Sequence, residues 1–203
     1  MRMHFPSTVA LASLALALSA PVSQAQEEHR QLGAHVHGHG TLDLAVEDQR
    51  MSLELEVPGM DIVGFEHAAQ SDEQKAAVAN ATSLLQRPLD IFVLPAAAGC
   101  RVASAEVALQ PEHEHDDDDA GHDHAAHEGA GDHDHDGHAG HNQFHATYSI
   151  DCADPAALTA ITFNYFKLFA GAQALTVNVA TAKGQSKYEV SRDKPTLDLA
   201  GVM

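Results

Sequence analysis

The chain is poor in positive charge, and this shortage limits its partners. It contains 11 lysine and arginine residues against 29 aspartate and glutamate residues, a formal net charge of −18 at pH 7. Such an excess of acid argues against nucleic acid or anionic lipid as a partner and favours cations. The sequence also lacks a GxSxG elbow, a Walker loop and a free catalytic cysteine. We therefore expect that the protein is not an enzyme.

Long apolar runs are absent beyond the N-terminus. The run from Val9 to Ala20 follows Arg2 and precedes small residues that end at Ala25, a pattern typical of a secretory signal peptide. It is too short for an ordinary membrane span. We therefore expect residues 1–25 to be cleaved as a signal peptide, the remaining chain to be periplasmic, and no stable insertion into a membrane.

Residues 111–141 lack lysine, arginine and any hydrophobic residue larger than alanine, but they hold nine histidines and eleven carboxylates. Such a segment cannot form a core, so we expect a disordered loop. Neutral imidazole suits zinc, copper(II) and nickel(II), and carboxylates add oxygen ligands. We expect several exchangeable zinc ions to bind here; the alternatives are a solubilising insert or calcium binding by the acids. The candidate ligands are His113, His115, His122, His124, His127, His133, His135, His138 and His141.

A second group of histidines, His35, His37 and His39, stands at alternating positions before the sequence TLDLAVE. On a regular strand all three side chains would point to one face. We therefore predict a structured metal site that uses two or three of them, with a solvated strand end as the alternative. His29 and His67 are candidates for further ligands, although each is also explained as an ordinary surface histidine.

The two cysteines indicate where the histidine-rich segment is inserted. Cys100 lies ten residues before Gln110, and Cys152 lies ten residues after Asn142, so the flanking strands are equal arms of a long hairpin. In an exported protein a lone cysteine pair is most simply a disulfide. A disulfide here would stabilise the fold by on the order of 4 kcal/mol. The rival interpretation is a metal site that contains cysteine.

The first part of the folded chain shows strand and helix patterns. TLDLAVE and MSLELEV carry apolar residues at every second position, and a tight turn between them pairs Val46 with Met51. A helix is expected over about 72–86, because Ser71 and Gln74 have the spacing of a capping box.

The second part predicts a similar arrangement. A helix is expected over about 155–170, begun by Asp154, and a closing hairpin turns at Gly184. LDIFVLP, before the first cysteine, is also expected to be a strand. The fold class is then α+β, with two similar halves, residues 26–110 and 142–203, of antiparallel strands plus one helix each. The histidine-rich loop is inserted in a hairpin between them.

Three stretches together resemble a known family. HVHGHGTLDLAVEDQRMSLELEVPGMDIVGFEH, the central insertion and FHATYSIDCADPAALTAITFNYFKLFAG are similar in order to the zinc-regulated periplasmic proteins called ZrgA. The resemblance covers essentially the whole mature chain. It implies an exported zinc-binding protein that accompanies zinc uptake and is made when zinc is scarce. It also implies that His35, His37 and the central segment are related to metal binding.

The sequence thus predicts a periplasmic accessory protein that captures zinc through its histidine-rich loop and supports uptake. The expected partners are zinc ions and a zinc ABC transporter or the binding protein of that transporter. The main alternative is an envelope buffer that protects against an excess of zinc, nickel or copper. A protein with only an interaction role in the envelope is the third hypothesis.

Overall fold

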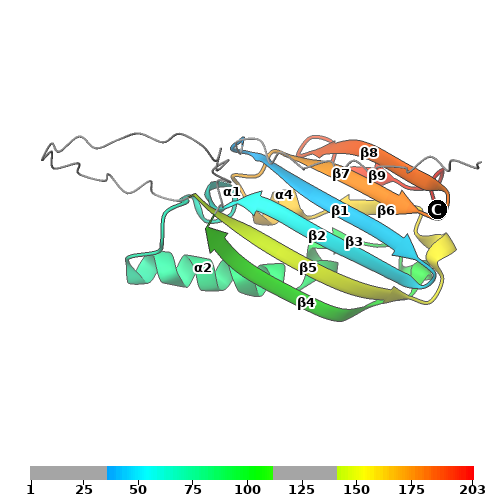
Figure 1. The fold of residues 1–203 in the computed structure, drawn as a ribbon, viewed down its shortest axis with the longest axis horizontal. Helices are drawn as coiled ribbons and strands as arrows, with labels where there is room; N and C mark the ends of the chain where they lie inside the picture. The colour runs from blue at the N-terminus through cyan, green and yellow to red at the C-terminus, as the bar shows by residue number, and fades with distance from the viewer. Residues whose placement is uncertain (1–35, 112–140) are drawn as a thin grey trace, which may run out of the picture. The chain divides into compact units, whose positions relative to one another are not determined.

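Strands make up about half of the part of the chain that the computed structural model describes, residues 36–111 and 141–203 (Figure 1). All of these residues belong to one unit, Ala34–Met203. The predicted signal peptide, residues 1–25, lies outside the described residues, and so does most of the histidine-rich segment.

The larger sheet contains six strands in the order β4-β5-β2-β1-β7-β8. The neighbouring strands are antiparallel except β1 and β7, which are parallel. The strands are β1 (His39–Glu47), β2 (Arg50–Pro58), β4 (Cys100–Pro111), β5 (Asn142–Cys152), β7 (Ala174–Thr181) and β8 (Gly184–Ser191).

A second layer lies behind this sheet in the view of Figure 1 and holds a small sheet with the order β3-β6-β9. Its strands are β3 (Phe92–Val93), β6 (Ala160–Phe163) and β9 (Thr196–Asp198). The helices are α1 (Gly59–Val63), α2 (Asp72–Leu85), α3 (Pro88–Ile91) and α4 (Tyr165–Leu168), with 3-10 turns at Ala96–Ala98 and Pro155–Ala157.

The core forms between the two layers because the long strands alternate apolar and polar residues. Leu42, Leu53 and Phe144 are fully buried on one face of the six-stranded sheet. Phe92 of the small sheet meets Tyr148 of the large one edge to face, with ring centroids 6.1 Å apart. The residues between these apolar positions form the opposite, polar face of the large sheet.

The first hairpin confirms the predicted register. Val46 pairs with Met51, and Asp43 lies opposite Glu54. The predicted helix over about 72–86 is α2, and the side chains of Ser71 and Gln74 form the reciprocal capping box. The closing hairpin of β7 and β8 is also present.

The predicted helix over 155–170 is wrong. Asp154 does cap a turn, because its carboxylate accepts the N–H of Ala156 at 3.2 Å. However, the turn stops at Ala157, and the chain then forms β6 and the short α4. Ile161 and Phe163 are buried at alternating positions between β3 and β9, and these partners stabilise a strand where the apolar spacing also fits a helix.

Two other predictions need correction. LDIFVLP is a strand only at Phe92–Val93, because Pro88 begins the short helix α3 before it. The division into two similar halves is not confirmed: strands from before and after the histidine-rich segment share the six-stranded sheet, and the second half lacks the long helix. The class α+β holds only broadly.

The long hairpin around the insertion is confirmed in its described part. β4 pairs with β5 from Cys100 opposite Cys152 to Pro111 opposite Asn142, with one irregularity between Val102 and Ser104. Cys100 and Cys152 form the predicted disulfide at the closed end of the arms. Residues 112–140 connect the other end and lie outside the described residues.

Candidate metal centres

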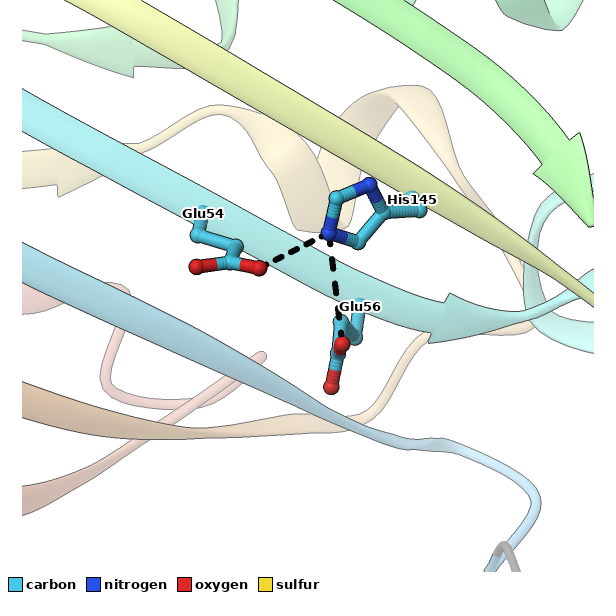
Figure 2. Close-up of side chains that lie close together, drawn as sticks. All are labelled: Glu54, Glu56 and His145. Atoms are coloured by element: carbon cyan, nitrogen blue, oxygen red, sulfur yellow. Dashed lines mark hydrogen bonds and ion pairs between the residues drawn. The ribbon is translucent and has the colours of Figure 1, made fainter. Parts of the chain in front are cut away.

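One group of possible metal ligands lies on the polar face of the large sheet (Figure 2). We call Glu54, Glu56 and His145 the sheet cluster. Glu54 and Glu56 point to the same face of β2, and His145 lies opposite Glu56 on β5. The Nε2 atom of His145 is 2.8 Å from Oε1 of Glu54 and 4.0 Å from Oε1 of Glu56. One ligand atom from each residue lies within 4.8 Å of the other two.

The next strand adds a third carboxylate beside the sheet cluster. Asp43 of β1 lies opposite Glu54, and its Oδ1 atom accepts a hydrogen bond from the side-chain amide of Asn178 at 2.7 Å. Opposed carboxylates on neighbouring strands repel each other unless a cation or solvent separates them. This part of the sheet is therefore an electrostatically favourable place for a cation.

A second group surrounds Glu66, and we call His37, Glu66 and His141 the Glu66 cluster. The Nε2 atom of His37 is 3.0 Å from Oε1 of Glu66, and the Nδ1 atom of His141 is 2.6 Å from Oε2. The Glu66 side chain is only 9% exposed, whereas the two histidine side chains are 57% and 58% exposed. A buried carboxylate thus holds one imidazole on each of its oxygens.

Hydrogen bonds fix both the backbone and the charge of Glu66. The Glu66 carbonyl accepts the N–H of Asn142, the first residue of β5, at 2.8 Å. Burial raises the pKa of the Glu66 carboxyl, but the hydrogen bonds from His141 and His37 outweigh burial, and the pKa lies below its ordinary value. The carboxylate is therefore ionised and positioned beside the histidine-rich segment.

Asp61 lies close to the Glu66 cluster in the interior. Its Oδ1 atom accepts the N–H of Gly38 at 2.6 Å, which places Gly38 at a positive φ of 84° between His37 and His39. In the described part of the chain, no donor reaches the buried Oδ2 atom. Burial raises the pKa of Asp61, although the Gly38 N–H and the nearby His37 lower it in part.

His37 and His39 do not lie on one regular strand, although the sequence predicts that they do. His35 lies outside the described residues. His37 is in a turn and contacts Glu66, whereas His39 begins β1, and its Nε2 atom is 2.9 Å from the hydroxyl of Thr176. The left-handed backbone at Gly38 separates them, because the regular strand begins only after it. The prediction of a regular strand through His37 is therefore wrong.

The other predicted ligands divide by position. His141 belongs to the Glu66 cluster, whereas the ring of His67 stacks on Phe65 with ring centroids 5.1 Å apart. His29 and eight histidines of the central segment lie outside the described residues; the eight are His113, His115, His122, His124, His127, His133, His135 and His138.

The sequence interpretation missed Glu66 and the sheet cluster. The alternation in NQFHATYSIDC places His145 on the polar face, but only the pairing of this strand with β4 was predicted. Its pairing with β2, which places His145 opposite Glu56, was not. Glu66 follows a turn after α1, and nothing in its local sequence distinguishes it from a surface acid. The sheet cluster requires the pairing of β2 with β5, whose nearest ends, Pro58 and Asn142, are 84 positions apart in the chain. Local sequence patterns do not show pairing at such a separation.

Both groups offer imidazole nitrogen and carboxylate oxygen, a donor combination that zinc accepts in proteins. No helix among the described residues is long and apolar enough to span a membrane.

The model of the ZrgA family of zinc uptake proteins matches residues 34–199, more than half of the chain. A search of curated proteins finds no match. The matched range includes every residue of the two clusters and both cysteines, so this protein belongs to the ZrgA family of zinc uptake proteins.

Proposed function

We propose that the protein is an exported zinc-binding accessory protein that captures zinc through its histidine-rich segment and supports zinc uptake. The observation that carries this proposal is the Glu66 cluster. It joins His141, the last histidine of the segment, to His37 from the N-terminal histidine group through one buried carboxylate. Two regions that the sequence marks for metal binding therefore meet at the same place in the fold.

The exposure of these side chains suits capture and release. Both histidines are more than half exposed, so an ion from solvent can reach their nitrogens, while the buried Glu66 keeps a negative charge between them. Zinc needs unprotonated imidazole, so binding would replace the contacts that now hold the rings against the carboxylate. A site of this kind exchanges its ion more readily than a closed site with four protein ligands.

The disulfide and the family together favour a place outside the cytoplasm, because a stable disulfide is rare in reducing compartments. A periplasmic location reached through a cleaved signal peptide fits this setting. The receiving partner in the proposal is a zinc ABC transporter or its binding protein. No catalytic step is part of the proposed function.

A buffer that protects against excess metal is the second candidate, and the nine histidines of residues 111–141 favour it because they provide a large capacity. Regulation separates the two roles, since zinc starvation should induce an uptake protein and zinc surplus should induce a buffer. Deletion of the gene should slow growth in zinc-depleted medium if the uptake role is correct.

Native mass spectrometry of the full mature chain with graded zinc tests the binding itself. We expect several zinc ions per chain, and we expect most of them to be lost when the nine histidines of residues 111–141 are changed to glutamine. The same number of ions in both proteins would show that the acids bind the metal. An absence of zinc from the wild-type chain would overturn the proposed function.

A further inference from the structure

The sheet cluster is distinct in the fold from the histidine-rich segment. Its three residues belong to β2 and β5, and the pairing of Glu56 with His145 fixes their backbones. We propose that Glu54, Glu56 and His145 form a separate zinc site on the body of the protein, with its ligands supplied by the sheet alone. This inference deepens the proposed function and rests on it, because it adds a structured site to a zinc-handling protein.

The distances between the ligand atoms are close to those around a bound zinc ion. Zinc lies about 2.0–2.2 Å from imidazole nitrogen and carboxylate oxygen, so two ligand atoms in a tetrahedral site are roughly 3.3–3.5 Å apart. The Nε2 atom of His145 is now 2.8 Å from Glu54 and 4.0 Å from Glu56. The first distance must lengthen and the second must shorten, each by less than about 1 Å, and the two carboxylate oxygens, which lie within 4.8 Å of each other, must also approach. Rotation of the glutamate side chains can provide these shifts.

The charges around the cluster also favour a cation. Within the described ranges, the ion pairs of Glu54 and Glu56 are both made with His145, which carries a charge only when it is protonated. Asp43 lies opposite Glu54 on the neighbouring strand and adds a third carboxylate. With neutral imidazole, Glu54 and Glu56 place two negative groups beside one nitrogen ligand, and a divalent ion would offset their charge.

The exposure of the ligands indicates an exchangeable ion. The side chains of His145, Glu56 and Glu54 are 27%, 32% and 49% exposed, so an ion can enter from solvent without a change in the sheet. Three protein ligands leave a fourth position for water or for a ligand from a partner.

The position of the cluster relates it to the histidine-rich segment. His145 lies three residues after Asn142, where β5 begins and where the chain returns from residues 112–140. Three residues of strand span about 10 Å. A zinc ion held at His141, the described end of the segment, would therefore have a short path to the sheet cluster.

The test follows the ring nitrogens of His145 by NMR in the full mature chain during addition of zinc. A His145→Gln variant assigns the signal among those of the other histidines. We expect the His145 signal to change on zinc binding, and we expect the Glu54→Gln/Glu56→Gln variant to lose that response and to bind one zinc ion fewer by native mass spectrometry. Magnesium in excess should leave the signal unchanged, because imidazole is a poor ligand for magnesium.

The matched control is Glu106→Gln/Glu189→Gln. Both residues are exposed, and their cross-strand partners are Thr147 and Thr176, so the control removes the same charge from the same face without touching the cluster. We expect this variant to keep the His145 response and the full number of zinc ions. Unchanged circular dichroism in both variants confirms that the sheet is intact.

Three outcomes would overturn the inference: a His145 signal that does not respond at zinc saturation, an equal response in the Glu54→Gln/Glu56→Gln variant, or an equal loss in the control. If the wild-type chain still binds zinc in any of these cases, the proposed function stands and only the sheet site is wrong. If the wild-type chain binds no zinc at all, both fail.

Discussion

Glu66 carries more of the local structure than its sequence context suggests. Its carboxylate binds His37 and His141, and its carbonyl receives the first N–H of β5. We expect Glu66→Gln to weaken the tightest zinc binding by roughly 10- to 100-fold, the range for loss of a carboxylate that supports a ligating histidine. Competition with a chelator of known zinc affinity measures this change.

The control for that experiment is Glu106→Gln, because Glu106 is an exposed acid on the edge strand β4. It should bind zinc as the wild type does. An affinity unchanged by Glu66→Gln would show that His37 and His141 take up zinc without the carboxylate, and the Glu66 cluster would then have only a structural role.

The burial of Asp61 predicts how the stability of the protein depends on pH. Burial raises its pKa above the ordinary value of 3.8, so Asp61 binds a proton more tightly in the folded state than in the unfolded chain. The stability that protonation provides is fully present below the unfolded pKa and is lost as the pH rises through the folded pKa. We expect Asp61→Asn, which has no charge to bury, to be more stable than the wild type at pH 7 by on the order of 1 kcal/mol.

This difference should shrink towards pH 4, and urea unfolding with a metal chelator present measures it at both pH values. The depressed pKa of Glu66 makes stability depend on pH in the opposite direction. Glu66 is present in both proteins, so its contribution does not account for the difference in stability between them. If Asp61→Asn were less stable at pH 7, the ionised carboxylate would be needed to accept the N–H of Gly38.

At the scale of single residues, the sequence predicted contacts only where a regular pattern fixed the register. The position of Asp43 opposite Glu54 followed from the alternation of two adjacent strands. The separation of His37 from His39 could not be predicted from such a pattern. It depends on a hydrogen bond from the N–H of Gly38 to Asp61, which is 23 positions away in the chain.

At the scale of elements, the long hairpin of β4 and β5 predicts that the protein folds without residues 112–140. The two strands pair along their whole length, and the disulfide of Cys100 and Cys152 closes one end. We expect deletion of residues 112–140, with a short glycine turn in their place, to leave a folded protein. Thermal unfolding should stay cooperative, with a Tm within a few degrees of the wild type, because no described core residue is removed.

The deletion keeps Pro111 and His141, so the Glu66 cluster remains. A Cys100→Ser/Cys152→Ser form of the same shortened chain serves as the control for the contribution of the disulfide, and it should be less stable than its parent. A molten or insoluble product in which the disulfide is still formed would show that the removed segment belongs to the core.

The elements also show where sequence patterns become ambiguous. Strands of eight residues or more, such as β1 and β5, were predicted correctly because many alternating positions agree. The region 155–170 contains a four-residue strand and a four-residue helix, and apolar spacing over so few residues fits either structure. Only the partners of β6, which are β3 and β9, decide between them.

For the whole molecule, the chemistry of histidine predicts how zinc retention depends on pH. Zinc and protons compete for the same nitrogens, and a free histidine titrates near about pH 6.5. We expect zinc to be held at about pH 7.5 and progressively released towards about pH 5.5, whereas binding by carboxylates alone would persist to about pH 4. Equilibrium dialysis at constant ionic strength measures the zinc retained.

The comparison protein has the nine histidines of residues 111–141 changed to glutamine. It should lose most of its zinc at every pH and retain only what the sheet cluster and His37 hold. An unchanged pH profile in this variant would assign the metal to the acids, and it would remove the explanation given for the histidine-rich segment.

The parallel pairing of β1 with β7 constrains the order in which the protein folds. His39 and Thr176, whose side chains meet beside this pairing, are 137 positions apart in the chain. During synthesis, β1 and β2 can form their hairpin early, but the other edge of β1 stays open until almost the whole chain has been made. Contacts at such long separation make folding slow, and an open apolar strand invites wrong pairing in the meantime. The sheet that positions Glu54, Glu56 and His145 can therefore be completed only after β7 and β8, near the C-terminal end of the sequence, have been made.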